Sequence, residues 1–134
     1  MTIDKVLYDK EHLTIYFESE HNLIRLKWKK FFTSEQYREG LTIALESANE
    51  LNAGLWLANL KNMEAIAPAD EDWSIEEFFP RLGKTGLQKL AIVTSLDFFN
   101  NTSVKRIVTS SQPYVNFETR YFVDEIDARA WLLG

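Results

Sequence analysis

Two short runs of alternating apolar and polar residues open the regular part of the chain, at residues 13–17 and 24–28. One face of the two runs is apolar throughout, with Leu13, Ile15, Phe17, Ile24, Leu26 and Trp28 at every second position. A period of two is typical of a strand with one buried face. The stretch 18–22 between the runs is polar and rich in turn formers, so the pattern predicts an antiparallel hairpin. The other face carries Thr14, Tyr16, Glu18, Arg25, Lys27 and Lys29, and we expect it to meet water.

Apolar positions recur at spacings of three and four residues after Thr33, which is the period of an amphipathic helix. The stripe consists of Tyr37, Leu41, Ala44, Leu45, Ala48 and Leu51. Thr33 and Gln36 form a capping-box signature at its start, and residues 52–54 supply a stop signal at its end. The first helix is therefore predicted over the segment between these two signals.

Two nearly continuous apolar runs, 55–60 and 90–93, predict strands that are covered by helices on both faces. A second helix is predicted between them. The acidic residues 70–72 mark its start, because negative charge suits the positive end of a helix dipole. Its apolar face consists of Ile75, Phe78, Phe79 and Leu82. Pro80 lies inside this pattern, where it is expected to kink or end the helix.

The last part of the chain continues the alternation of strands and helices. Ser95 or Asp97 can cap a third helix, residues 117–122 predict a last strand, and Asp124 can cap a final helix. The predicted order is ββαβαβαβα, an α/β fold with four main helices and a mixed sheet of about five strands. Because the chain has 134 residues, we predict one domain, 1–134.

Composition and charge restrict the functions that such a domain can serve. The chain is 46% hydrophobic and 26% charged, which is typical of a folded globular protein. It has no cysteine, which excludes disulfides and cysteine-ligated zinc. No apolar run reaches the ~18 residues of a membrane span and no signal-peptide pattern is present, so we predict a cytoplasmic protein without an integral membrane segment. The formal net charge of -5 argues against nucleic acid as a partner.

The sequence contains no recognised pattern for catalysis or metal binding. Residues 83–85 are Gly-Lys-Thr, but a phosphate-binding loop also needs glycine at the position that Phe78 occupies. His12 and His21 lie at the start of the first hairpin and in its turn, where we expect both to be solvated. No triad or ligand spacing surrounds them. We therefore predict a non-enzymatic protein with no catalytic residue, no metal site and no cofactor.

Aromatic side chains are concentrated on the predicted second helix, at Trp73, Phe78 and Phe79. Most such residues belong to a core. Trp73 lies off the apolar stripe, however, so this group is also a candidate for lining a pocket or an exposed surface. In open parallel sheets ligands bind at the carboxyl ends of the strands. The polar residues expected there are Asn59, Lys61, Ser95 and Asp97, which complete the candidate ligand-binding or partner-binding positions.

Four segments spread over nearly the whole chain form a recognisable series. They are Trp56-Leu57-Ala58-Asn59-Leu60, Trp73 with Phe78-Phe79-Pro80-Arg81-Leu82, Leu90-Ala91-Ile92-Val93, and Arg120-Tyr121-Phe122 with Ala130-Trp131-Leu132. This series resembles the SpoIIAA-like group of bacterial STAS-related proteins. The resemblance implies a STAS-like fold, related to that of anti-sigma-factor antagonists and, by looser analogy, to CRAL-TRIO lipid-binding domains.

The resemblance also implies a regulatory switch, in which a serine of an Asp-Ser-Ser-Gly type segment is phosphorylated at the start of the helix after the third strand. This chain departs from that pattern. The stretch from Asn59 to Ser74 has no such segment, and Ser74 is its only serine. The acidic residues 70–72 and 76–77 around Ser74 would also repel a phosphate.

Two hypotheses on function follow. The first is a non-enzymatic STAS-like regulatory or protein-interaction domain, which docks a protein partner or associates with itself as a homodimer. The alternative is a domain that binds a small apolar or lipid-like ligand in a pocket near the aromatic second helix. Measurements of association test the first hypothesis, and a map of internal cavities tests the second.

Overall fold

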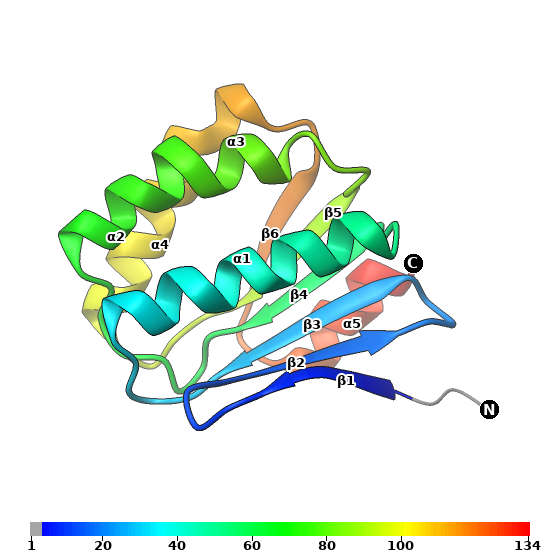
Figure 1. The fold of residues 1–134 in the computed structure, drawn as a ribbon, viewed down its shortest axis with the longest axis horizontal. Coiled ribbons are helices and arrows are strands. Elements are labelled where there is room, and N and C mark those ends of the chain that lie inside the picture. The colour runs from blue at the N-terminus through cyan, green and yellow to red at the C-terminus, as the bar shows by residue number, and fades with distance from the viewer. Residues whose placement is uncertain (1–3) are drawn as a thin grey trace.

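Six strands form one sheet in the sequential order β1-β2-β3-β4-β5-β6 (Figure 1). The computed structural model describes residues 4–134. The strands are β1 (Asp4–Asp9), β2 (Leu13–Glu18), β3 (Leu23–Trp28), β4 (Leu55–Asn59), β5 (Lys89–Val93) and β6 (Glu118–Phe122). The strands β1, β2 and β3 pair antiparallel, whereas β3, β4, β5 and β6 pair parallel. The carboxyl ends of the parallel strands therefore share one edge of the sheet, which we call the carboxyl edge.

Helices cover both faces of the sheet unequally (Figure 1). The helical elements are α1 (Ser34–Glu50), α2 (Pro68–Trp73), the π-helix η1 (Ser74–Phe78), α3 (Phe79–Leu82), α4 (Phe98–Ser111), the 3-10 helix η2 (Gln112–Tyr114) and α5 (Glu125–Leu133). The segments α2, η1 and α3 follow one another without a break, and we call them together the arm. One face of the sheet carries α1, the arm and α4, and the other face carries α5.

Each covered face has its own hydrophobic core. The larger core fills the space between the sheet and the helical elements α1, the arm and α4 on that face, and it includes the aromatic residues Trp28, Trp56, Phe78 and Phe79. The smaller core lies under α5 and consists of Leu23, Leu57, Ala91, Val93, Ala128 and Leu132. Because β4 and β5 contribute side chains to both cores, their sequences are apolar at nearly every position.

The mixed α/β fold predicted from the sequence is confirmed, with one strand more than the five expected. The additional strand, β1, pairs antiparallel with β2, and its register shifts between Val6 and Tyr8. Most of its residues are exposed or half-buried. An edge strand that packs so little apolar surface leaves only a weak alternation in the sequence.

The expectation that Pro80 ends the second helix is wrong, and the alternative of a kink at this position stays a prediction. The arm continues through this position, because the π-helix immediately before it widens the backbone and the N–H of Phe79 bonds to the carbonyl of Ser74. Pro80 then falls in the first turn of α3, where a missing N–H costs little.

Two polar residues predicted to meet water are buried instead. Thr14 and Glu18 of β2 have 5% and 4% of their surface exposed. The hydroxyl of Thr14 donates to the carboxylate of Asp9 on β1, and Glu18 is paired with Arg129 of α5. The sequence prediction missed both because their covering elements, β1 and α5, come from the two ends of the chain.

Candidate functional site

An apolar cavity of about 70 Å³ lies between the sheet and the helices α1, α4 and the arm. Its lining comes from β3, β4 and β5 (Leu26, Trp28, Trp56, Ala58, Leu90, Ile92), α1 (Tyr37, Leu41), the arm (Phe78, Phe79, Leu82), α4 (Val104, Ile107, Val108) and the loop between β4 and α2 (Leu60, Met63, Ile66). The Tyr37 hydroxyl is the only hydroxyl group in this lining. The chemistry of the cavity is therefore almost entirely that of hydrocarbon and aromatic surface.

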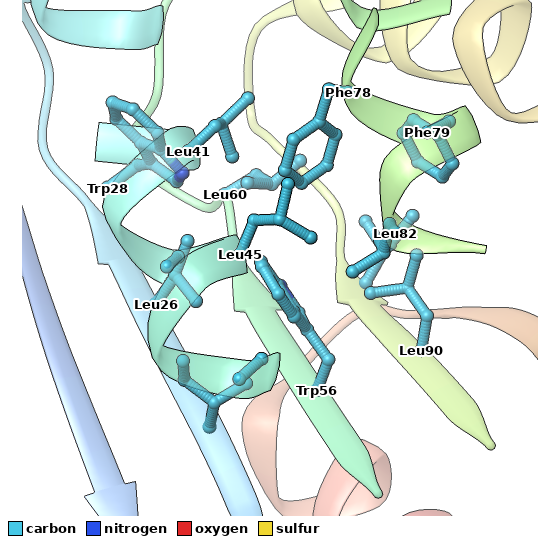
Figure 2. Close-up of a cluster of buried hydrophobic side chains, with 14 of the residues drawn as sticks. Leu26, Trp28, Leu41, Leu45, Trp56, Leu60, Phe78, Phe79, Leu82 and Leu90 are labelled. Carbon is cyan, nitrogen blue, oxygen red and sulfur yellow. The ribbon is translucent and has the colours of Figure 1, made fainter. Parts of the chain in front are cut away.

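The cavity follows from how large, rigid side chains meet. Figure 2 shows Leu41 of α1 on one side of the space, with Phe78 and Phe79 of the arm on the other. Trp56 rises from β4 between them, and its ring lies edge-on to that of Phe78 at 6.0 Å. Aromatic rings adopt few rotamers and do not collapse into residual space as a flexible chain can. Ala58, on a central strand, consequently remains only half-buried.

A buried carboxylate joins the arm to α1 at the side of the cavity. Asp70 has 1% of its surface exposed. It accepts hydrogen bonds from Ser34 Oγ at 2.6 Å and from Arg38 Nε at 2.8 Å. We call Ser34, Arg38 and Asp70 the Asp70 latch. A buried charge is tolerated where it is paired and hydrogen-bonded, so the latch fixes the arm against the start of α1.

A second polar contact links the same two elements beneath the latch. The hydroxyl of Ser74 donates to the carbonyl oxygen of Asp70 at 2.8 Å, and the Tyr37 hydroxyl lies 2.7 Å from Ser74 Oγ. Burial raises the pKa of Tyr37, so this phenol stays protonated and donates to Ser74. Ser74 is itself buried, and its hydroxyl both donates one hydrogen bond and accepts another. The only serine of the stretch from Asn59 to Ser74, where the resemblance would place a phosphorylation segment, is thus inside the protein.

The three aromatic candidates from the sequence lie together on the arm. Phe78 and Phe79 line the cavity, and their rings are 5.4 Å apart. Trp73 is half-buried beside the cavity, with its ring 6.1 Å from the rings of both Tyr37 and Phe78. The guanidinium of Arg38 lies 5.5 Å from the Trp73 ring centroid. Trp73 thus packs beneath the Asp70 latch.

The polar candidates lie at the carboxyl edge and hold its loops in shape. Asn59 Nδ2 donates to Glu125 Oε2 at 2.9 Å, and its Oδ1 accepts from the backbone N–H of Lys61. Ser95 is buried and donates to the carbonyl of Met63 at 2.6 Å. Asp97 caps α4 by accepting from the backbone of residue 100. The Lys61 side chain is exposed. A ligand or partner role for these residues stays a prediction.

Sequence reasoning missed part of the lining and the latch. Met63 and Ile66 reach the cavity from a loop, where no period identifies a buried face. The sequence predicts Asp70 only as an acidic residue at the start of a helix, whereas its side chain is bonded to α1. The one available signal was the pair of serine and arginine at positions 34 and 38, one helical turn apart and both able to donate to a carboxylate.

The face of the sheet under α5 carries a second polar cluster. Arg129 donates from both terminal nitrogens to the two carboxylate oxygens of Glu18, at 2.7 Å each. These hydrogen bonds hold the pKa of Glu18 below its usual value against the opposing effect of burial. Arg25 lies 3.5 Å from Asp4 and from Glu125. The cluster contains three carboxylates and two guanidinium groups, and its contacts join α5 to the sheet.

The described residues offer little for metal or acid–base chemistry. Within residues 4–134 no group of three or more histidine, aspartate and glutamate side chains is arranged to hold a metal ion. His12, expected to be solvated, is buried, accepts or donates one hydrogen bond with the Tyr8 hydroxyl at 3.0 Å, and has its pKa lowered by burial. None of the helices in this part of the chain is long and apolar enough to cross a bilayer.

The strand order and the distribution of helices define a STAS-like α/β domain. The sheet begins with antiparallel strands and continues with parallel strands, and a single C-terminal helix, α5, covers its second face. The chain belongs to the SpoIIAA-like family, because the model of that family matches residues 23–133.

A solved structure supports the same fold. The crystal structure of an uncharacterized protein of the DUF3478 family with a SpoIIAA-like fold, from Shewanella loihica PV-4, superposes with a TM-score of 0.57. The two proteins are 18% identical, and the match covers 98% of this chain and 93% of that chain. At this identity the likeness shows the fold alone. No curated protein is significantly similar to this chain in sequence.

Proposed function

We propose that this protein binds a small apolar molecule in the cavity between α1 and the arm. The observation that carries the proposal is an unfilled space of about 70 Å³ whose lining is apolar on every side. An apolar cavity of about 150 Å³ binds benzene and xenon in an otherwise well-packed protein. The space here accommodates a smaller group, such as one end of an alkyl chain, without movement of the arm.

The lining favours an apolar occupant over water. A buried water needs two to four polar partners. The Tyr37 hydroxyl, the one hydroxyl group available, is already bonded to Ser74. The lining contains no carboxylate, and the raised pKa of Tyr37 keeps its phenol protonated. Both observations support binding without chemical change and a non-enzymatic role.

Xenon tests this proposal, because it is small enough for the cavity and binds apolar space without hydrogen bonds. In the wild-type protein we expect amide chemical-shift changes under xenon pressure at Trp56, Phe78 and their neighbours. Ala58→Leu, which extends a side chain into the space, should abolish them, and Ala58→Val should weaken them. The matched control is Ala130→Leu, at an exposed position of α5.

Two outcomes would overturn cavity binding. One is a wild-type protein whose spectrum does not respond to xenon. The other is a response that persists in folded Ala58→Leu, since the gas would then occupy a different site. Native mass spectrometry of protein purified from cells would next identify the mass of the natural occupant.

We infer a second role, as an interaction domain, on the basis of a different feature. Large apolar side chains are exposed at the carboxyl edge, where Leu96, Phe98, Phe99, Val123 and Ile126 are each at least 69% exposed. Clustered apolar exposure on a soluble protein marks an interaction site. Sedimentation velocity over a range of concentrations distinguishes a homodimer, whose sedimentation coefficient rises with concentration, from a monomer that docks other molecules.

A further inference from the structure

The exposed apolar side chains belong to two short segments at the carboxyl edge, residues 94–99 and 122–127. The strands that precede them, β5 and β6, are parallel neighbours with Val93 opposite Phe122. The backbone N–H of Thr94 also donates to the carbonyl of Phe122 at 2.9 Å. Both segments therefore leave the sheet side by side at the same edge (Figure 1). We call residues 94–99 and 122–127 together the acidic edge.

The first segment holds its apolar residues in a fixed loop. Asn101 binds the backbone of Ser95 through both ends of its amide, at 3.1 Å to the N–H and 2.8 Å to the carbonyl. Ser95 Oγ accepts from the N–H of Asp97 at 2.9 Å. The rings of Phe98 and Phe99 meet edge to face at 5.5 Å. A partner would thus meet a preformed surface, which lowers the entropy lost on binding.

The charges that the two segments themselves carry have one sign. The two segments contain Asp97, Asp124, Glu125 and Asp127, and no lysine or arginine. Glu125 lies 3.5 Å from Arg25, and the carboxylates of Asp97 and Asp124 cap α4 and α5. Asp127 is exposed. The two segments are therefore negative, on a chain whose formal net charge is already -5. The exposed Lys61 is a positive charge beside them, since its carbonyl accepts from the N–H of Leu96 at 3.0 Å.

We propose that the acidic edge docks a basic amphipathic segment of another protein, whose apolar side chains cover Leu96 and Phe99 and whose lysines or arginines face Asp97, Asp124 and Asp127. This inference rests on the interaction role proposed above. Charge complementarity selects the partner: an anionic membrane surface and a second copy of this acidic edge are both repelled by these carboxylates. Exposed aromatic residues such as Phe98 and Phe99 are typical anchors of such an interface.

A designed peptide pair tests the proposal. The probe is a fluorescein-labelled amphipathic peptide with leucine on one face and lysine on the other, and its control carries glutamate in place of lysine. Fluorescence anisotropy should show that the full chain binds the lysine peptide and not the glutamate peptide. The double variant Leu96→Ser with Phe99→Ser should weaken binding about tenfold or more, as expected for central anchors.

A second variant removes charge while keeping the helix caps. Asp97→Asn, Asp124→Asn and Asp127→Asn combined should weaken binding of the lysine peptide several-fold, because asparagine caps a helix as well as aspartate does. The matched control is Tyr114→Ser, an exposed aromatic position on η2, which precedes β6 and so lies away from the carboxyl edge. This control should bind like the wild type. Circular dichroism confirms that each variant is folded.

The outcomes separate the partner class from the interaction role. Three other results would overturn the basic partner and retain the role of the edge: binding of the glutamate peptide, dimerisation, or attachment to phosphatidylcholine or phosphatidylglycerol vesicles. Each counts in this way only if the Leu96→Ser, Phe99→Ser variant abolishes it. Lysine-peptide binding that no edge variant changes would overturn both. Xenon binding in the cavity should be the same in this variant as in the wild type, so failure of the edge does not bear on the cavity.

Discussion

Asp70 is the most deeply buried carboxylate in the described part of the chain. It is nearly inaccessible to water, yet it belongs to a short helix at the outside of the molecule, and both of its side-chain donors come from α1. Arg38 is 40% exposed at its side chain, so the pair is only partly desolvated and its attraction is only partly screened. The latch can therefore hold the arm without the full penalty of a buried ion pair.

At the residue scale we predict that Asp70→Ala loosens the arm. The change leaves Ser34 Oγ and Arg38 Nε without their acceptor, and hydrogen bonds to a charged group contribute about 1.5–3 kcal/mol. We expect the free energy of unfolding, measured by urea denaturation, to fall by about 2 kcal/mol. Hydrogen exchange of the α2 amides should become faster as the arm opens locally.

Asp72→Ala is the control for this variant. Asp72 lies on the same helix and binds Arg106 at 3.0 Å, but its side chain is 56% exposed. An exposed ion pair contributes little, so Asp72→Ala should change stability much less than Asp70→Ala does. Equal effects of the two substitutions would show that Asp70 acts only through the charge at the helix start.

At the element scale the arm shows where local sequence rules succeed and where they fail. The first helix was predictable from local information, because its capping box at Thr33 and Gln36 is formed as expected. The continuation of the arm through Pro80 was not, because the π-helix that accommodates it depends on how Phe78 and Phe79 pack against the sheet. Tertiary packing decides such a turn, and no spacing in the sequence encodes it.

The arm ends in a contact that only a glycine permits. A Cβ on Gly83 would lie 2.1 Å from the carbonyl oxygen of Tyr114 in η2, a backbone atom that cannot rotate away. We predict that Gly83→Ala lowers the free energy of unfolding by roughly 1–3 kcal/mol, the usual effect of overpacking. Gly86→Ala has open space and no unusual backbone angle, so it should be neutral or slightly stabilising.

Urea denaturation of the two glycine variants compares them directly. If Gly83→Ala were as stable as Gly86→Ala, the end of the arm would not be packed against η2 as the structure has it. A larger difference in the free energy of unfolding between the two variants means that the contact of Gly83 with η2 contributes more to holding the arm. This contact lies at the end of the arm opposite to the Asp70 latch.

At the scale of the whole molecule, the order of strands and helices was predictable, but the candidate site was predictable only in part. The alternation of strand patterns and helix patterns along the chain predicted the mixed sheet. The apolar stripe of the second helix identified Phe78 and Phe79 as candidate site residues. The cavity depends on side chains from three strands, three helical elements and a loop, so its existence could not be read from any one segment. The exposure of Leu96 and Val123 could not be predicted from their neighbours in the sequence either, because it depends on whether distant parts of the chain cover them.

The contact between Glu18 and Arg129 joins positions that are 111 residues apart, and it predicts how the whole fold responds to acid. Hydrogen bonds from Arg129 lower the pKa of Glu18 in the folded protein, whereas in the unfolded chain it is close to the usual value of about 4.3. The stabilisation is therefore fully present above that value and is lost as the pH falls through the lowered pKa of the folded state.

Glu18→Gln should lower the free energy of unfolding at neutral pH by about 2 kcal/mol, because the charged partner of Arg129 is removed. Its deficit relative to the wild type should shrink as urea denaturation is repeated at pH values falling from about 4.3 through the lowered pKa of folded Glu18, where the wild-type carboxyl also becomes neutral. Glu118→Gln is the control, since Glu118 pairs with Arg120 at the exposed surface at 2.9 Å. A deficit for Glu18→Gln that is the same at neutral and acid pH would show that shape, and not charge, makes Glu18 the anchor of α5.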